Sequence, residues 1–92
     1  MKLDVEKIKE IYGNQAIYEL KENLEDVIYN MNTLANHGFT DIYDIVEKNP
    51  YLFTKPTDIF EEYLEKLIQK LGVNFIEKLE NDNSLWGEIN DW

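Results

Sequence analysis

The sequence has no cysteine and no arginine among its 92 residues, and it has one histidine and one serine. Without cysteine, disulfides, thiolate zinc sites and cysteine nucleophiles are excluded. Without arginine, the chain has no guanidinium group to bind phosphate or guanine through two parallel hydrogen bonds. A single serine, Ser84, and a single histidine, His37, nearly exclude a hydrolytic triad. We therefore predict a non-enzymatic protein with no catalytic residue and no cofactor.

Long hydrophobic runs are also missing. No apolar stretch approaches the roughly 18 residues of a membrane span, and the N-terminus lacks the apolar segment of a secretory signal. We therefore expect a cytoplasmic protein that does not contact a membrane. The length fits one domain, residues 1–92, and the 43% of apolar residues are enough for a core.

Negative charge is the strongest feature that is present. Nineteen acidic residues face nine lysines, which gives a net charge of −10. Such a chain repels a phosphate backbone, so we expect no direct nucleic-acid binding and a basic protein as the partner. The frequent Lys, Asn, Ile and Tyr, at the expense of Arg, Ala and Gly, are typical of AT-rich coding sequences and indicate a low-GC bacterium or one of its mobile elements.

Apolar residues recur at three- and four-residue steps along most of the chain, which is the pattern of amphipathic helices. Helices are predicted over residues 3–12, 17–35, 40–49, 56–71 and 74–79, with a short last one after Ser84. No segment alternates with period two. The sequence therefore predicts an all-α, compact bundle of five or six helices. The two longest stripes give the predicted core: Leu24, Val27, Ile28, Met31, Phe60, Leu64, Leu67 and Ile68.

A joint of glycine, apolar residue and N-cap occurs twice, 34 residues apart. Leu34-x-x-x-Gly38-Phe39-Thr40 corresponds to Ile68-x-x-x-Gly72-Val73-Asn74. Each glycine follows a predicted helix and is expected to cap it with a positive φ. The two stretches are either repeat-like helix–Gly–helix units or one common helix joint used twice, and repeat architectures usually need at least three copies.

Residues 34–72 also carry a family resemblance. This stretch contains Leu34, Gly38-Phe39-Thr40, Pro50 and Phe53. Their spacing resembles that of the helical repeat of the mitochondrial transcription termination factor family. The resemblance implies a helical repeat that grips nucleic acid with basic residues. The absence of arginine and the negative charge depart from that family, so only the local shape is carried over. A helical-repeat nucleic-acid-binding fragment is the second functional hypothesis.

Acidic side chains gather on single faces of two predicted helices. Asp58, Glu61, Glu62 and Glu65 occupy positions i, i+3, i+4 and i+7 of the fourth helix, and Asp41, Asp44 and Glu47 lie on the third. These faces are either solvated surfaces that keep the protein soluble or a surface for a basic partner. Trp86 and Trp92 flank further acids and are either packing residues or interface anchors.

Carboxylates also raise the hypothesis of a small metal protein or enzyme. The Glu-x-x-His pairs of dinuclear helical sites are absent, so we predict no metal site. The leading hypothesis is an acidic interaction protein. In its most concrete form it is a small phage or mobile-element inhibitor or regulator, anti-CRISPR-like or a nucleic-acid mimic. It would bind a basic, nucleic-acid-handling protein through the acids and tryptophans named above.

Overall fold

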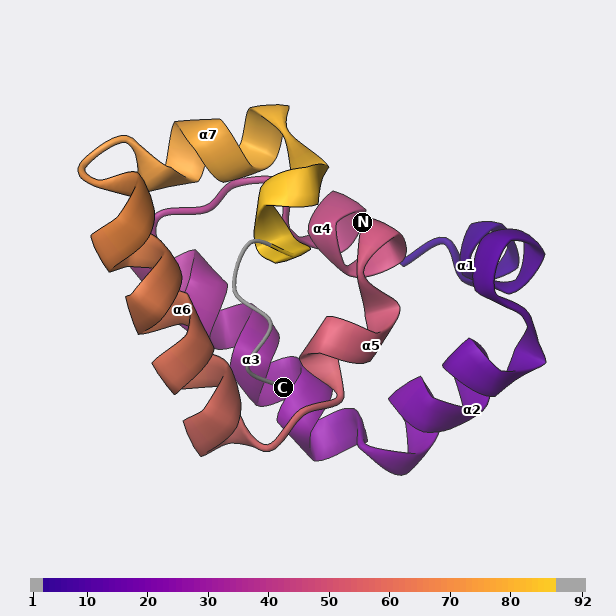
Figure 1. The fold of residues 1–92 in the computed structure, drawn as a ribbon. Helices are drawn as coiled ribbons and strands as arrows, with labels where there is room; N and C mark the ends of the chain where they lie inside the picture. The colour runs from indigo at the N-terminus through magenta and orange to yellow at the C-terminus, as the bar shows by residue number, and fades with distance from the viewer. Residues whose placement is uncertain (1–2, 88–92) are drawn as a thin grey trace.

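The computed structural model describes residues 3–87, which form seven α-helices and one 3₁₀ helix (Figure 1). In chain order these are α1 (Val5–Tyr12), α2 (Asn14–Glu22), α3 (Leu24–His37), α4 (Ile42–Lys48), α5 (Pro50–Phe53), α6 (Thr57–Leu71), α7 (Phe75–Asn81) and η1 (Asn83–Gly87). The described residues contain no strand, which confirms the all-α prediction.

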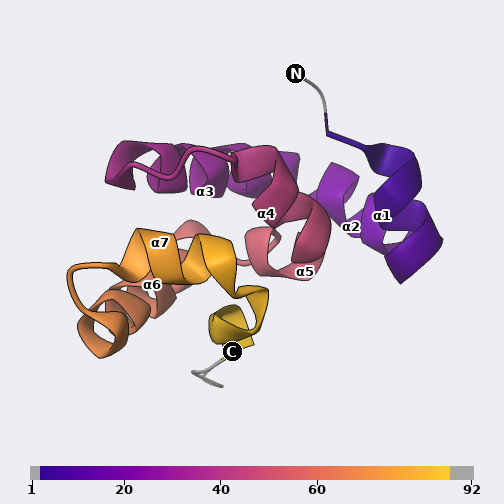
Figure 2. The same ribbon diagram turned by 90° about the horizontal axis from the view of Figure 1, so that it is seen from above.

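The helices form three groups. In both views α1 and α2 lie at one end of the molecule, and α6 and α7 lie at the other together with α3, while α4 and α5 lie between the two ends (Figure 1, Figure 2). Helices α3 and α6 pack against each other, and α5 contacts α2, α3 and α4. The largest fully buried apolar side chains come from all three groups: Ile8, Leu34, Val46, Phe53, Phe60, Leu64, Leu67 and Leu79.

The predicted second helix is two helices, because the chain breaks at Asn23. The Asn23 side-chain amide donates a hydrogen bond of 2.9 Å to the carbonyl of Glu19, and the Asn23 backbone N–H bonds the same carbonyl at 3.1 Å. Asparagine side chains compete with helical hydrogen bonds in this way and favour helix ends. The break accounts for one of the helices beyond the five or six that the sequence predicts, and the single turn of α5 accounts for another.

The core prediction is correct for three of its four residues on α6 and partly wrong for α3. Phe60, Leu64 and Leu67 are buried, and Ile68 is partly buried. On α3, Val27 is buried and Met31 is partly buried. However, Leu24 and Ile28 are 53% and 51% exposed. Successive residues of a helix are separated by about 100° around the axis, so one flank of the predicted stripe can remain in solvent while Val27, Asn30 and Leu34 face the core.

Asn30 is the buried polar residue of α3. Its side chain is fully buried, and its Nδ2 donates hydrogen bonds of 3.0 Å to the carbonyls of both Phe53 and Lys55. These two carbonyls lie in the chain that leaves α5 and enters α6. The hydrogen bonds therefore fix where α6 begins relative to α3.

The two helix–Gly–helix units are both present, but their joints differ. Gly38 and Gly72 have positive φ angles of 106° and 84°, as predicted. Gly38 is left-handed with ψ of 6°, whereas Gly72 has ψ of −159°. As a result Phe39 is buried and Val73 is 96% exposed. The two joints thus direct their following helices differently.

Two predicted N-caps are not formed as expected. Asp41 occupies the N-cap position of α4, while the backbone N–H and the Oγ1 of Thr40 both donate to Glu80 at 3.2 Å. Asn74 is the N-cap residue of α7 but makes no capping hydrogen bond with its side chain. Thr40 therefore ties the α3–α4 joint to α7 and does not start α4.

Candidate functional site

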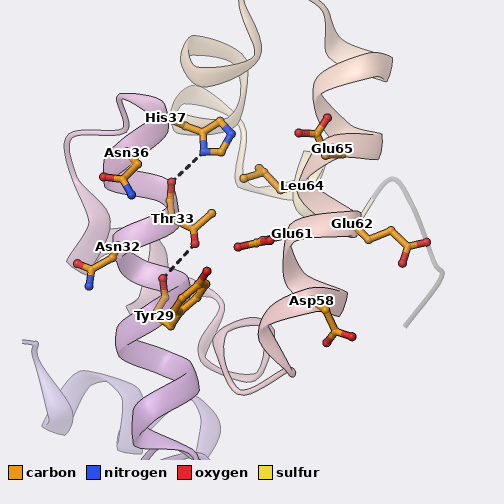
Figure 3. A pocket seen from close by; sticks show the side chains of 10 residues that line it. All are labelled: Tyr29, Asn32, Thr33, Asn36, His37, Asp58, Glu61, Glu62, Leu64 and Glu65. Atoms are coloured by element: carbon orange, nitrogen blue, oxygen red, sulfur yellow. Dashed lines mark hydrogen bonds between the residues drawn. The ribbon is translucent and has the colours of Figure 1, made fainter.

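A groove of about 660 Å³ runs between α3 and α6 (Figure 3). Helix α3 contributes Tyr29, Asn32, Thr33, Asn36 and His37, and helix α6 contributes Asp58, Glu61, Glu62, Leu64 and Glu65. We refer to this set as the acidic groove. All four acids that the sequence predicts as a binding face on the fourth helix line it.

The groove follows from the amphipathic pattern of α6. Phe60, Tyr63, Leu64 and Leu67 are buried, and Leu64, at 1% exposure, reaches the groove from this buried face. Successive residues are separated by about 100° around the helix axis. A residue that directly follows a buried one, such as Glu61 after Phe60 or Glu65 after Leu64, therefore lies on the flank of the helix. The carboxylates therefore lie on the exposed flank of α6, beside its buried apolar face.

The α6 wall is strongly negative. No lysine is among the described residues that line the groove. The Glu62 carboxylate lies 3.7 Å from the Lys66 ammonium, one helical turn further along α6. Figure 3 shows Glu61 directed toward α3 and Glu62 directed away from it. Glu61 is thus the carboxylate that most directly faces the opposite wall.

The α3 wall carries no carboxylate and is internally hydrogen-bonded. Thr33 Oγ1 donates to the carbonyl of Tyr29 at 3.1 Å, and His37 Nδ1 donates to the carbonyl of Thr33 at 2.8 Å. Hydrogen bonding with the Glu61 carboxylate of the opposite wall and the negative charge of that group raise the pKa of Tyr29. The groove therefore offers carboxylates on one side and polar groups without a carboxylate on the other.

The predicted acids of α4 lie elsewhere and are largely engaged. The Asp44 carboxylate lies 2.9 Å from the Lys48 ammonium, and this hydrogen bond raises the pKa of Lys48. Glu47 accepts a hydrogen bond of 2.8 Å from the backbone N–H of Asp4 and lies 3.5 Å from the Lys7 ammonium. Glu47 therefore joins α4 to α1, which is a structural role.

Asp41 and Asp44 line a smaller pocket of about 200 Å³, together with Glu80 of α7. Glu80 is already bound by Thr40. The structure thus does not bring the α4 acids into the acidic groove, and the two predicted acidic faces are separate surfaces.

Of the two tryptophans that the sequence predicts as binding residues, Trp86 lies in the core and not on a surface. Trp86 is 4% exposed, and its ring centroid lies 6.0 Å from that of Phe39. Trp86 is therefore a packing residue of the core, which is one of the two roles that the sequence allows. Trp92 lies outside the described residues.

The sequence did not predict the α3 wall. Tyr29, Thr33 and His37 are spaced at i, i+4 and i+8, so the polar flank itself is visible in the sequence. However, α3 has two flanks beside its buried face, and the contact with α6 decides which one lines a groove. That choice depends on residues far apart in the chain.

Within residues 3–87, no group of three or more His, Asp or Glu residues is arranged to hold a metal ion. No helix of this range combines the length and the apolar character needed to cross a membrane. No protein family model, curated protein or solved structure matches this chain. The resemblance of residues 34–72 to the termination factor repeat therefore stays a prediction.

Proposed function

We propose that this chain is a non-enzymatic acidic protein that binds a basic segment of another protein in the acidic groove. The observation that carries the proposal is the asymmetry of that groove, which has four carboxylates on α6 and no lysine among its described lining residues. A basic side chain that enters such a groove meets the negative charge of these carboxylates.

The spacing of the acids favours a partner that handles nucleic acid. Asp58 to Glu65 spans about 10 Å of helix axis, or about 3.5 Å per carboxylate. One strand of duplex DNA carries a phosphate about every 3.4 Å along its axis. A protein surface built to bind phosphates therefore meets a similar linear charge density on α6. A small cytoplasmic inhibitor or regulator from a phage or mobile element, such as an anti-CRISPR, is the most concrete form of this proposal.

The test uses two pairs of substitutions with equal change in net charge. Glu61→Lys with Glu65→Lys reverses two acids of the groove at i and i+4. Glu6→Lys with Glu10→Lys reverses two exposed acids at the same spacing on α1. The probe is a synthetic lysine-rich amphipathic peptide, titrated by calorimetry at increasing salt. We expect the groove pair to weaken binding at least about tenfold and the α1 pair to weaken it less than about threefold.

Two outcomes would contradict the proposal. Equal losses for both pairs would show that only net charge attracts the peptide, as expected for solvated acidic faces. Binding of the unmodified protein to duplex DNA in a mobility-shift assay would contradict the repulsion argument and support the termination factor resemblance instead.

A further inference from the structure

The acidic groove contains the single histidine of the chain, His37, at the last position of α3. Its side chain is exposed, so the ring can exchange protons with water. Histidine is the side-chain type that changes its charge between about pH 5 and 8, whereas free carboxylates and phenols ordinarily change theirs outside that range. The charge of the α3 wall therefore depends on the state of one residue.

Two contacts hold the His37 ring in a defined orientation. Its Nδ1 lies 2.8 Å from the carbonyl oxygen of Thr33, and because a carbonyl can only accept, Nδ1 carries the hydrogen. Its ring centroid lies 6.4 Å from that of Phe75 in an edge-to-face arrangement. In the neutral ring the second nitrogen, Nε2, therefore has no hydrogen, and it is the atom that gains the proton.

The charged groups that face His37 from α6 are carboxylates. Figure 3 shows His37 and Glu65 pointing toward each other across the groove. The other acids of the same wall are Asp58, Glu61 and Glu62. A proton on His37 therefore places a positive charge inside a groove whose other charged lining residues, among those described, are all negative.

Helix α7 also packs near His37, and its charged groups do not line the groove. The Lys78 ammonium donates to a backbone carbonyl at the end of α6 at 2.8 Å, and Glu80 accepts from Thr40. Glu77 is likewise absent from the groove lining. The electrostatic environment that His37 meets in the groove is thus set by the acids of α6.

We propose that His37 makes the binding of a basic segment in the acidic groove depend on pH, with tighter binding when the ring is neutral. This inference rests on the proposed function of the groove. A protonated ring repels the positive charges of the segment and attracts Glu65, one of the carboxylates that would bind it. A neutral ring does neither. The affinity should therefore fall as pH drops through the range in which histidine takes up a proton.

The experiment compares the parent protein with His37→Gln, whose amide can also donate to the Thr33 carbonyl but does not take up a proton. The probe is the lysine-rich amphipathic peptide, acetylated at its N-terminus and titrated by calorimetry at about pH 7.5 and about pH 5.5 at one salt concentration. Its lysines keep their charge at both pH values. On this change the parent should lose at least about threefold more affinity than His37→Gln, which is the effect of one nearby unit charge in water.

His37→Lys imitates the protonated state, so it should bind the peptide at both pH values as weakly as the parent does at the lower one. Gln15→Lys is the matched control, because it adds the same charge at an exposed position of α2 that does not line the groove. Its affinity should stay close to that of the parent at each pH. Circular dichroism at both pH values checks that the variants are folded, as expected for substitutions at exposed positions.

The possible failures of this inference and of the proposed function can be told apart. Absence of peptide binding to the parent at the higher pH would overturn the proposed function and this inference with it. Binding at the higher pH, followed by equal losses for the parent and His37→Gln at the lower pH, would overturn this inference alone. Equal affinities of His37→Lys and Gln15→Lys would also overturn it, because they would show that only net charge matters.

Discussion

Tyr29 of α3 and Glu61 of α6 lie on opposite walls of the acidic groove, and the Glu61 carboxylate raises the pKa of Tyr29 through hydrogen bonding and its negative charge. In Figure 3 both side chains point toward the space between the two helices. This contact joins two helices whose centres lie about thirty residues apart in the chain. It also uses the carboxylate that faces α3 most directly, so a basic ligand in the groove would compete with Tyr29 for Glu61.

The first prediction concerns the titration of Tyr29. Glu61 raises the pKa of Tyr29 above its ordinary value of 10.0 through the hydrogen bond and its negative charge. The contact favours the neutral phenol, so its stabilising effect is complete below the ordinary pKa and is lost as pH rises through the raised pKa. NMR of ¹³C-labelled tyrosine measures this value directly. Glu61→Gln should lower it toward the ordinary value.

Glu62→Gln provides the control for this titration. The Glu62→Gln substitution removes the same charge from the same helix. The Glu62 side chain, however, points away from α3 (Figure 3). The Tyr29 pKa should therefore change little in this variant. Equal shifts in both variants would show that the general charge of α6, and not the contact with Glu61, is responsible.

The second prediction concerns the core of α6. Leu64 and Leu67 are 1% and 0% exposed, and replacement of either by alanine should reduce the free energy of unfolding by about 2–5 kcal/mol. Ile28→Ala is the comparison, because Ile28 is 51% exposed and its loss leaves little cavity. Urea denaturation followed by circular dichroism measures both. A loss below about 0.5 kcal/mol for Leu64→Ala would contradict the burial of this face.

The third prediction concerns the glycine joints. Gly38→Ala and Gly72→Ala should each destabilise the protein by about 1 kcal/mol or more, because both glycines have positive φ. The cost should be larger at Gly72, whose φ of 84° with ψ of −159° lies in a region that essentially only glycine adopts, than at the left-handed Gly38, where an added Cβ lies 3.3 Å from the end of the Ile76 side chain. Thermal unfolding can rank the two variants. Gly87→Ala is the control, since Gly87 has neither a positive φ nor a close neighbour within residues 3–87.

The fourth prediction concerns the buried amide of Asn30. Asn30→Ala removes the donor to the carbonyls of Phe53 and Lys55 and should cost about 1–3 kcal/mol of unfolding free energy. Amide hydrogen exchange should then show faster opening of the start of α6, because that hydrogen-bonded link positions it. If exchange there is unchanged while global stability falls, Asn30 contributes through packing alone.

Much of the fold was predictable because it depends on local patterns. The helices, the positive φ at Gly38 and Gly72 and the acidic flank of α6 all follow from residues within one or two helical turns of each other. The break at Asn23 was missed because the apolar spacing continues across it, while the interruption comes from a hydrogen bond of the asparagine side chain.

The sequence alone therefore determined that this protein is helical and acidic, and which face of α6 carries its charge. Tertiary structure decided which flank of α3 lines a groove, because each amphipathic helix has two flanks and only contact with α6 distinguishes them. It also buried Trp86 against Phe39 and gave Glu47 a partner on α1. These outcomes depend on residues about forty positions apart, and local periodicity carries no information about such pairs.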